Sequence, residues 1–205
     1  MNKVKALLLV LIMATLQATA TNRVFNQQEV YESLYALLQM SYDDPGDIGV
    51  EYESLDITRN LVVLNDESAD EIYCWWEDVG LPDINRSVFK SNQPQIADIW
   101  KILFYGISRC NYFLENATDT DETTLLQCAE ARFIRAYLYS IALDLWGGVP
   151  IYTSSDMTQK KGRNTGSEVF DFIVSELNGC LPSLPLPSAT PKTLRWTAPT
   201  PTPTR

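Results

Sequence analysis

The 205-residue sequence contains no histidine, and this absence excludes several classes of enzyme at once. Neither a Ser-His-Asp triad nor a Cys-His nucleophile can form without imidazole, and no zinc site can use histidine ligands. The four cysteines never occur as a C-x-x-C pair, which excludes a zinc ribbon and a thioredoxin-type redox motif. We therefore expect no catalytic residues of these kinds, no cofactor and no metal site.

Positive charge is also scarce. Lysine and arginine number 16 against 26 aspartates and glutamates, which gives a net charge of −10. An acidic surface repels phosphate backbones, so we expect no nucleic-acid partner. Hydrophobic residues make up 45% of the chain and charged residues 20%, a composition typical of a globular protein with a buried core.

Residues 1–20 have the features of a cleaved signal peptide. Lys3 and Lys5 precede a short apolar run at 6–16, and Ala18-Thr19-Ala20 is an A-x-A cleavage signal. The apolar run is too short to span a bilayer, which requires about 20 residues. A buried N-terminal helix is the alternative, but the pattern favours export.

The remaining chain predicts an all-α fold, because apolar residues recur at the helical period of 3.6 in four segments. The expected helices are residues 27–40 with Asn26 as N-cap, residues 94–117, residues 123–146, and a helix that begins at Thr165 with a T-x-x-E capping box to Glu168. Residues 50–92 show no clear period, and we expect mostly loop with short helical pieces. Seven of the eleven prolines lie in residues 181–205, so residues 188–205 are expected to form a disordered Pro/Thr-rich tail.

The short connection between residues 94–117 and 123–146 predicts an antiparallel hairpin of the kind that builds tetratricopeptide-like repeats. Residues 123–146 are apolar almost all round, so this helix must be enclosed on most sides. Cys110 and Cys128 should then lie at the same level of the hairpin. They could form a disulfide, but two free thiols are favoured because helix axes lie about 8–10 Å apart.

Four motifs occur in the same order as in a known family. Trp100, Ile107 and Asn111 fit the spacing of its W-x-x-x-Y-x-x-I-x-x-x-N helix, with Tyr105 one position after the motif's tyrosine, and residues 129–139 (AEARFIRAYLY) are similar to its A-E-A-x-F-x-R-A-x-x-Y helix. The turn at 147–151 (GGVPI) and the helix from Arg163 to Leu181-Pro182 complete the set. Together they cover about residues 25–187, and the chain resembles the N-terminal part of SusD/RagB proteins.

The resemblance implies an α-helical, SusD-like fold with tetratricopeptide-like hairpins and a function in nutrient capture. Such proteins bind oligosaccharides or peptides at the outer membrane, act with a SusC-like TonB-dependent transporter, and carry out no chemistry. The chain departs from the family in lacking a lipobox cysteine after the apolar run, which leaves its lipid anchor open. Family members are commonly more than twice as long. We therefore expect residues 21–187 to form an incomplete helical region, truncated, and poorly soluble alone.

The candidate ligand-binding residues are Tyr73, Trp75, Trp76 and Asp66. Sugar rings pack their C–H faces on aromatic rings while polar neighbours take the hydroxyl groups. One of the two adjacent tryptophans is expected to belong to the core, since large aromatic residues usually pack inside.

Two alternative functions remain open. The first is a helical protein-interaction module. The second is a glycoside hydrolase that uses the acidic residues at 66–71, although a crowded acidic run is more often a solvated face. Arg132 and Arg135 could contact an anionic ligand, but ion pairs between helices are the favoured interpretation.

Overall fold

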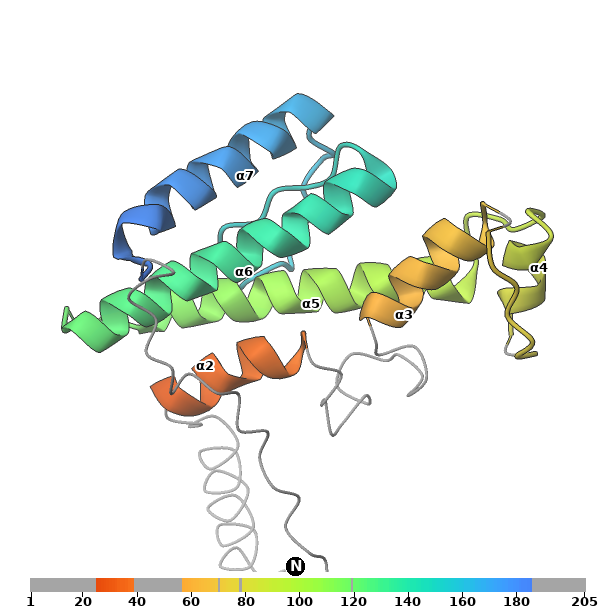
Figure 1. Ribbon diagram of the computed structural model, residues 1–205. Helices are drawn as coiled ribbons and strands as arrows, with labels where there is room; N and C mark the ends of the chain where they lie inside the picture. Colours follow the sequence, from red (N-terminus) through yellow and green to blue (C-terminus); the bar gives the residue numbers. More distant parts are fainter. Residues whose placement is uncertain (1–24, 39–56, 70, 78, 119, 186–205) are drawn as a thin grey trace, which may run out of the picture.

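The computed structural model describes residues 25–38, 57–69, 71–77, 79–118 and 120–185. Within these ranges the fold is all-α, as predicted, and contains no strand. Figure 1 shows the arrangement of the helices, whose bounds are α2 (Gln27–Ala36), α3 (Ile57–Val62), α4 (Leu81–Asn85), α5 (Pro94–Asn116), α6 (Glu122–Trp146) and α7 (Gly166–Cys180). A π-helical turn, η3 (Val63–Glu67), follows α3, and a 3₁₀ turn, η4 (Leu181–Ser183), follows α7. The proposed signal peptide at 1–20 and the tail at 188–205 lie outside the described residues.

Helices α5 and α6 form the antiparallel hairpin that the sequence predicts (Figure 1). Pro94 occupies the first turn of α5, where its missing N–H is not needed. At the start of α6, the Asp121 side chain accepts a hydrogen bond from the Thr124 backbone N–H at 3.0 Å. Both predicted helix ranges are correct to within one residue. Cys110 is buried and Cys128 half-buried, and both are free thiols, as favoured.

Helix α7 packs against α6 and begins with the predicted capping box. The Thr165 hydroxyl accepts from the Glu168 N–H at 3.3 Å, while the Glu168 carboxylate accepts from the Thr165 N–H at 2.7 Å. The spacing of Val169, Phe170, Ile173 and Leu177 predicts a buried stripe. This is confirmed for Val169 and Ile173, which lie in the main core, and is wrong for Phe170 and Leu177, which are exposed. The adjoining part of α7 is apolar but exposed, since Phe170, Val174 and Leu177 face solvent, as does Leu181 of η4.

Helix α6 is enclosed on most sides, as predicted, but not on all. Its neighbours α5, α7 and α2 cover most of its surface, whereas Phe133 and Tyr137 remain exposed. The expectation of enclosure on most sides is confirmed for the other faces, where Ala131, Leu138 and Ala142 are fully buried.

An ion-pair network joins α5, α6 and α7. The Arg135 Nε donates to Glu176 Oε2 at 2.8 Å, and the Arg135 Nη1 donates to Asn111 Oδ1 at 2.6 Å. Arg132 donates to the other Glu176 oxygen at 3.1 Å. Asn111 in turn donates to the carbonyl groups of Tyr152 and Ser154, in the segment that connects α6 to α7. The favoured interpretation of both arginines, interhelical ion pairs, is confirmed.

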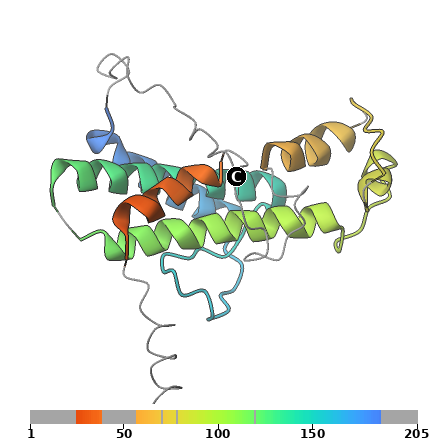
Figure 2. The same ribbon diagram turned by 90° about the horizontal axis from the view of Figure 1, so that it is seen from below.

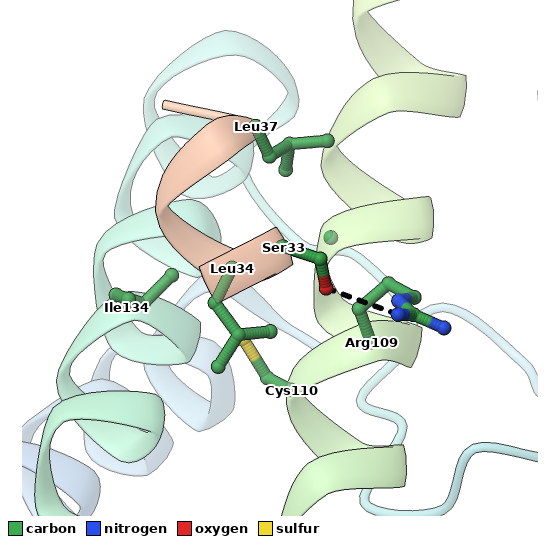
Figure 3. A pocket seen from close by; sticks show the side chains of 7 residues that line it. Ser33, Leu34, Leu37, Arg109, Cys110 and Ile134 are labelled. Carbon is green, nitrogen blue, oxygen red and sulfur yellow. Dashed lines mark hydrogen bonds between the residues drawn. The ribbon is translucent and has the colours of Figure 1, made fainter. Parts of the chain in front are cut away.

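Helix α2 lies across the hairpin and is shorter than predicted, since it ends at Ala36. Figure 3 shows Leu34 between Cys110 of α5 and Ile134 of α6, whereas Leu37, the residue after α2, points toward α5. Gly106 allows this close approach, because an added Cβ would lie 2.4 Å from a Leu37 methyl carbon. No space as large as a water molecule remains between these side chains, so the junction is packed core and not a ligand site.

A small lobe projects beyond the hairpin at the N-terminal end of α5, as Figures 1 and 2 both show. It consists of α3, η3 and α4, and its own core is formed by Val63, Leu81 and Ile84. Two glutamine amides fix the lobe to α5: Gln93 Nε2 donates to the Gly80 carbonyl at 2.6 Å, and Gln95 Nε2 donates to the Val79 carbonyl at 2.9 Å. The prediction of loop with short helical pieces is confirmed for the described part of residues 50–92.

Candidate functional site

An irregular segment of the small lobe, residues 71–77, presents three aromatic side chains to solvent, and we call it the aromatic loop. Trp75 is 85% exposed, Tyr73 is 64% exposed and Trp76 is 60% exposed. The Tyr73 and Trp75 rings contact each other edge to face, with centroids 5.1 Å apart.

Cys74, which lies between Tyr73 and Trp75 in the sequence, anchors the aromatic loop to the rest of the small lobe. Cys74 packs against the lobe core, and its carbonyl accepts a hydrogen bond from Asn85 Nδ2 at 3.2 Å. Arg59 of α3 lies over the Trp76 ring, with its guanidinium carbon 5.0 Å from the ring centroid. This cation–π contact orients Trp76 while leaving most of it accessible.

The expectation that one tryptophan of the pair belongs to the core is wrong. The core of the small lobe is filled by Val63, Leu81 and Ile84, with Cys74 against it, so neither indole is needed inside. Exposing an indole forgoes about 4 kcal/mol of burial energy, from about 170 Å² at about 25 cal/mol per Å². Apolar surface gathered on one segment in this way is a feature of interaction sites.

Asp66, the fourth predicted ligand residue, lies half-buried in η3. The structure brings Tyr73, Trp75 and Trp76 together on the aromatic loop, whereas Asp66 belongs to another element. Its role in binding stays a prediction. The neighbouring acidic residues differ from one another: Glu67 is buried at the end of η3 and Glu71 is exposed, so the acidic run is not a solvated face at Glu67.

Sequence reasoning missed three residues that shape the loop, namely Arg59, Glu67 and Asn85. Glu67 is buried in the same lobe, and this burial raises the pKa of its carboxyl group. A hydrogen bond with Cys74 and the positive charge of Arg59 lower the pKa and so partly oppose the shift. No local pattern relates Arg59 to Trp76 or Asn85 to Cys74, because these pairs are separated by 17 and 11 residues in the sequence.

The raised pKa of Glu67 predicts a pH dependence of the small lobe. A carboxyl group with a folded-state pKa above its unfolded value stabilises the fold at pH values below about 4.3, and this stability is lost as pH rises through the folded-state pKa. We expect Glu67→Gln to make the lobe more stable at pH 7.5 and to flatten its pH dependence. Amide hydrogen exchange of residues 57–69 at pH 5 and pH 7.5 measures this.

Glu71→Gln is the matched control, since Glu71 is an exposed carboxylate at the edge of the same loop. It should leave the pH dependence of lobe exchange unchanged. The same pH dependence of lobe hydrogen exchange in the two variants would show that Glu67 is not buried in solution.

Neither a metal centre nor a membrane span is found in the part of the chain that the structure describes. No three side chains of histidine, cysteine, aspartate or glutamate gather there in a way that could hold a metal ion. None of the described helices combines the length and apolar character needed to cross a bilayer.

Comparison with known proteins agrees with the motifs. Residues 58–198 match the SusD-like family described as "Starch-binding associating with outer membrane". The chain is 30% identical over 167 residues to the starch-binding protein SusD of Bacteroides thetaiotaomicron, which covers 77% of this chain and 30% of SusD. It is 32% identical over 89 residues to the SusD-like protein P25 of Formosa agariphila, covering 40% of this chain and 17% of that protein.

Solved structures show the same fold. A SusD-like carbohydrate-binding protein of Bacteroides fragilis superposes with a TM-score of 0.60 at 20% identity, covering 82% of this chain and 33% of that one. A laminarin-binding SusD-like protein gives a TM-score of 0.59 at 18% identity, covering 78% and 34%. The chain thus spans about a third or less of the length of these relatives. The predicted resemblance and the predicted all-α SusD-like fold are confirmed, and this chain belongs to the SusD-like family.

Proposed function

We propose that this protein captures an oligosaccharide on the aromatic loop and is a binding protein without catalytic activity. The observation that carries the proposal is the set of three exposed rings, Tyr73, Trp75 and Trp76, on one short segment. Tyr73 and Trp75 form a corner with an interplanar angle of 78°, so a sugar ring can lie against one ring face and contact the edge of the other. Asp66 is the candidate acceptor for sugar hydroxyl groups.

The relatives support a glycan as the ligand. SusD is named as a starch-binding protein, and one solved SusD-like protein of similar fold is named as binding laminarin. Both starch and laminarin are neutral polysaccharides of glucose, whose rings present apolar C–H faces. Exposed indole and phenol rings are the protein groups suited to such faces.

We further propose that the protein is exported by the signal peptide at residues 1–20 and acts at the outer membrane with a SusC-like TonB-dependent transporter. The family description, which places its members in association with the outer membrane, supports this location. The A-x-A signal at Ala18-Thr19-Ala20 supports export. N-terminal sequencing of the protein recovered from a Gram-negative outer-membrane fraction tests the export and the location. We expect a mature chain that begins at Thr21.

The binding proposal predicts that changing Trp75 and Trp76 together to alanine weakens oligosaccharide binding at least tenfold. The variant removes two of the three stacking surfaces but no core side chain, so helicity should not change. Isothermal titration with maltoheptaose and laminarihexaose measures binding, and far-UV circular dichroism checks the fold. Unchanged affinity for a sugar that the parent protein binds would remove these residues from the site.

A second candidate function is the helical protein-interaction module, and one observation favours it. Phe170, Val174 and Leu177 of α7, continued by Leu181 of η4, form an exposed apolar stripe, at spacings of four, three and four residues. A protein partner bound there would be retained by the Trp75/Trp76 variant and lost when Phe170 and Leu177 are changed to serine. Loss of the partner in the tryptophan variant would instead assign the contact to the aromatic loop.

A further inference from the structure

A hollow of about 280 Å³ lies where the C-terminal end of α6 meets α5, well apart in sequence from the aromatic loop. It is lined by Trp100, Trp146, Gly148, Pro150, Lys161 and Arg163. Small-molecule pockets usually measure about 300–1,000 Å³. This one is therefore suited to a single ring and not to an extended chain.

Two indole rings form the apolar wall of the hollow. Trp100 and Trp146 meet nearly at right angles, with centroids 5.0 Å apart and an interplanar angle of 85°. The Phe104 ring stacks on the Trp100 ring, with ring centroids 4.3 Å apart, and restricts its motion. Both tryptophans are half-buried. The wall is thus rigid before any ligand arrives, which lowers the entropy cost of binding.

Two cations form the polar wall. Arg163 donates through Nε and Nη2 to the carbonyl groups of Gly148 and Trp146, so its guanidinium group is fixed while further N–H groups remain. Lys161 donates to the Ile151 carbonyl at 2.9 Å and lies over the Tyr152 ring. None of the six lining residues is acidic, and neither cation has a carboxylate partner among the described residues.

This concentration of positive charge is unusual for the chain. Three of its 16 basic residues occupy the four positions Lys160-Lys161-Gly162-Arg163, although the net charge is −10. In an acidic protein, an unpaired pair of cations beside a hollow raises the local concentration of anions. A fixed guanidinium beside an ammonium matches an oxyanion, of which the carboxylate is the form that sugars of uronic-acid type carry.

We propose that this hollow binds an acidic sugar unit, a pyranose that carries a carboxylate. The ring lies against Trp100 and Trp146, and the carboxylate accepts hydrogen bonds from Lys161 and Arg163. The choice of a sugar over another ring-shaped acid rests on the proposed function, whereas the preference for an anion rests on the hollow alone. The site would make the protein select glycans that contain uronic acid.

The test uses trigalacturonic acid as the probe and its fully methyl-esterified form as the neutral match. The indole N–H signals of the five tryptophans are followed by NMR during titration. We expect the acid to shift the signals of Trp100 and Trp146, and the ester to do so at least tenfold more weakly. Equal shifts by both forms, or none by the acid, would overturn the proposal.

Lys161→Gln removes one cation at nearly constant size, and Lys160→Gln is its control, because Lys160 is exposed and does not line the hollow. We expect Lys161→Gln to weaken binding of the acid about tenfold, the effect of losing one charge-assisted hydrogen bond. Lys160→Gln should change it less than twofold. An equal loss in both variants would reduce the effect to overall charge and contradict the site.

The same spectra separate this proposal from the proposed function. Acid-induced shifts of Trp100 and Trp146 that persist in the Trp75→Ala/Trp76→Ala variant support an independent hollow. Their disappearance in that variant contradicts it. Failure of the neutral glucans to move the Trp75 and Trp76 signals would count against the aromatic loop only.

Discussion

Replacing Glu176 by alanine is expected to destabilise the protein by about 3–5 kcal/mol, the usual cost of breaking a buried ion pair from one side. The side chains of Arg135 and Glu176 are only 8% and 7% exposed, so the remaining guanidinium charge would be left inside without its partner. Arg132 would lose the same carboxylate. Urea unfolding monitored by far-UV circular dichroism gives the change in free energy.

Two further variants separate the charge effect from lost packing. Changing Arg135 to methionine together with Glu176 to leucine removes both charges at similar volume, and we expect it to cost less than Glu176→Ala alone. Arg132→Ala should cost less than about 1 kcal/mol, because the Arg132 side chain is 34% exposed and its pair with Glu176 is screened by solvent. If the Arg135→Met/Glu176→Leu variant is as unstable as Glu176→Ala, stability at this position depends on the ion pair itself and not on avoiding an unpaired buried charge.

The three long helices could be predicted from the sequence because each carries a complete local signal. Pro94 starts α5, the Thr165–Glu168 capping box starts α7, and the glycines after Trp146 end α6. The apolar period between these positions runs over 15 to 25 residues. The predicted start of α2 is correct, because Asn26 caps the helix there. Its end at Ala36 could not be predicted, because no glycine or proline marks it.

The positions and packing of the short helices in the small lobe could not be predicted, because these helices are too short to show a period. Helices α3 and α4 contain six and five residues. Such helices are unstable alone and form through tertiary contacts, here the cluster of Val63, Leu81 and Ile84. For the same reason, the sequence identifies Trp75 and Trp76 as candidates but does not show that the lobe core is filled without them.

The ion-pair network was predictable in kind but not in detail. Two arginines in a mostly apolar helix favour carboxylate partners on neighbouring helices. Which carboxylate this is depends on how α7 crosses α6, and nothing local in the sequence fixes that crossing. The role of Asn111 as a bridge to the carbonyl groups of Tyr152 and Ser154 depends on the path of the connecting segment.

That path is set at Gly148, and Gly148→Ala is the second change with a large expected effect. An added Cβ would lie 1.9 Å from the Asn164 carbonyl oxygen and 3.0 Å from its carbonyl carbon, so backbone would have to separate from backbone. The separation would also disturb the hydrogen bond from the Asn164 N–H to the Val149 carbonyl, at 3.3 Å. We expect about 3–5 kcal/mol of destabilisation, the sum of overpacking and lost hydrogen bonds.

Gly147→Ala provides the matched comparison one residue earlier. Gly147 has φ of 71° and ψ of −116°, so alanine there is strained, yet its Cβ would meet nothing within 4 Å. Its cost should be about 1–3 kcal/mol and arise from the backbone conformation alone.

Only Gly148→Ala should release α7 from α6, because Asn164 immediately precedes the cap of α7. Hydrogen exchange should therefore accelerate in residues 166–180 at low denaturant for Gly148→Ala, and not for Gly147→Ala. Equal exchange in the two variants would mean that the close approach of Gly148 to Asn164 does not hold α7 in place.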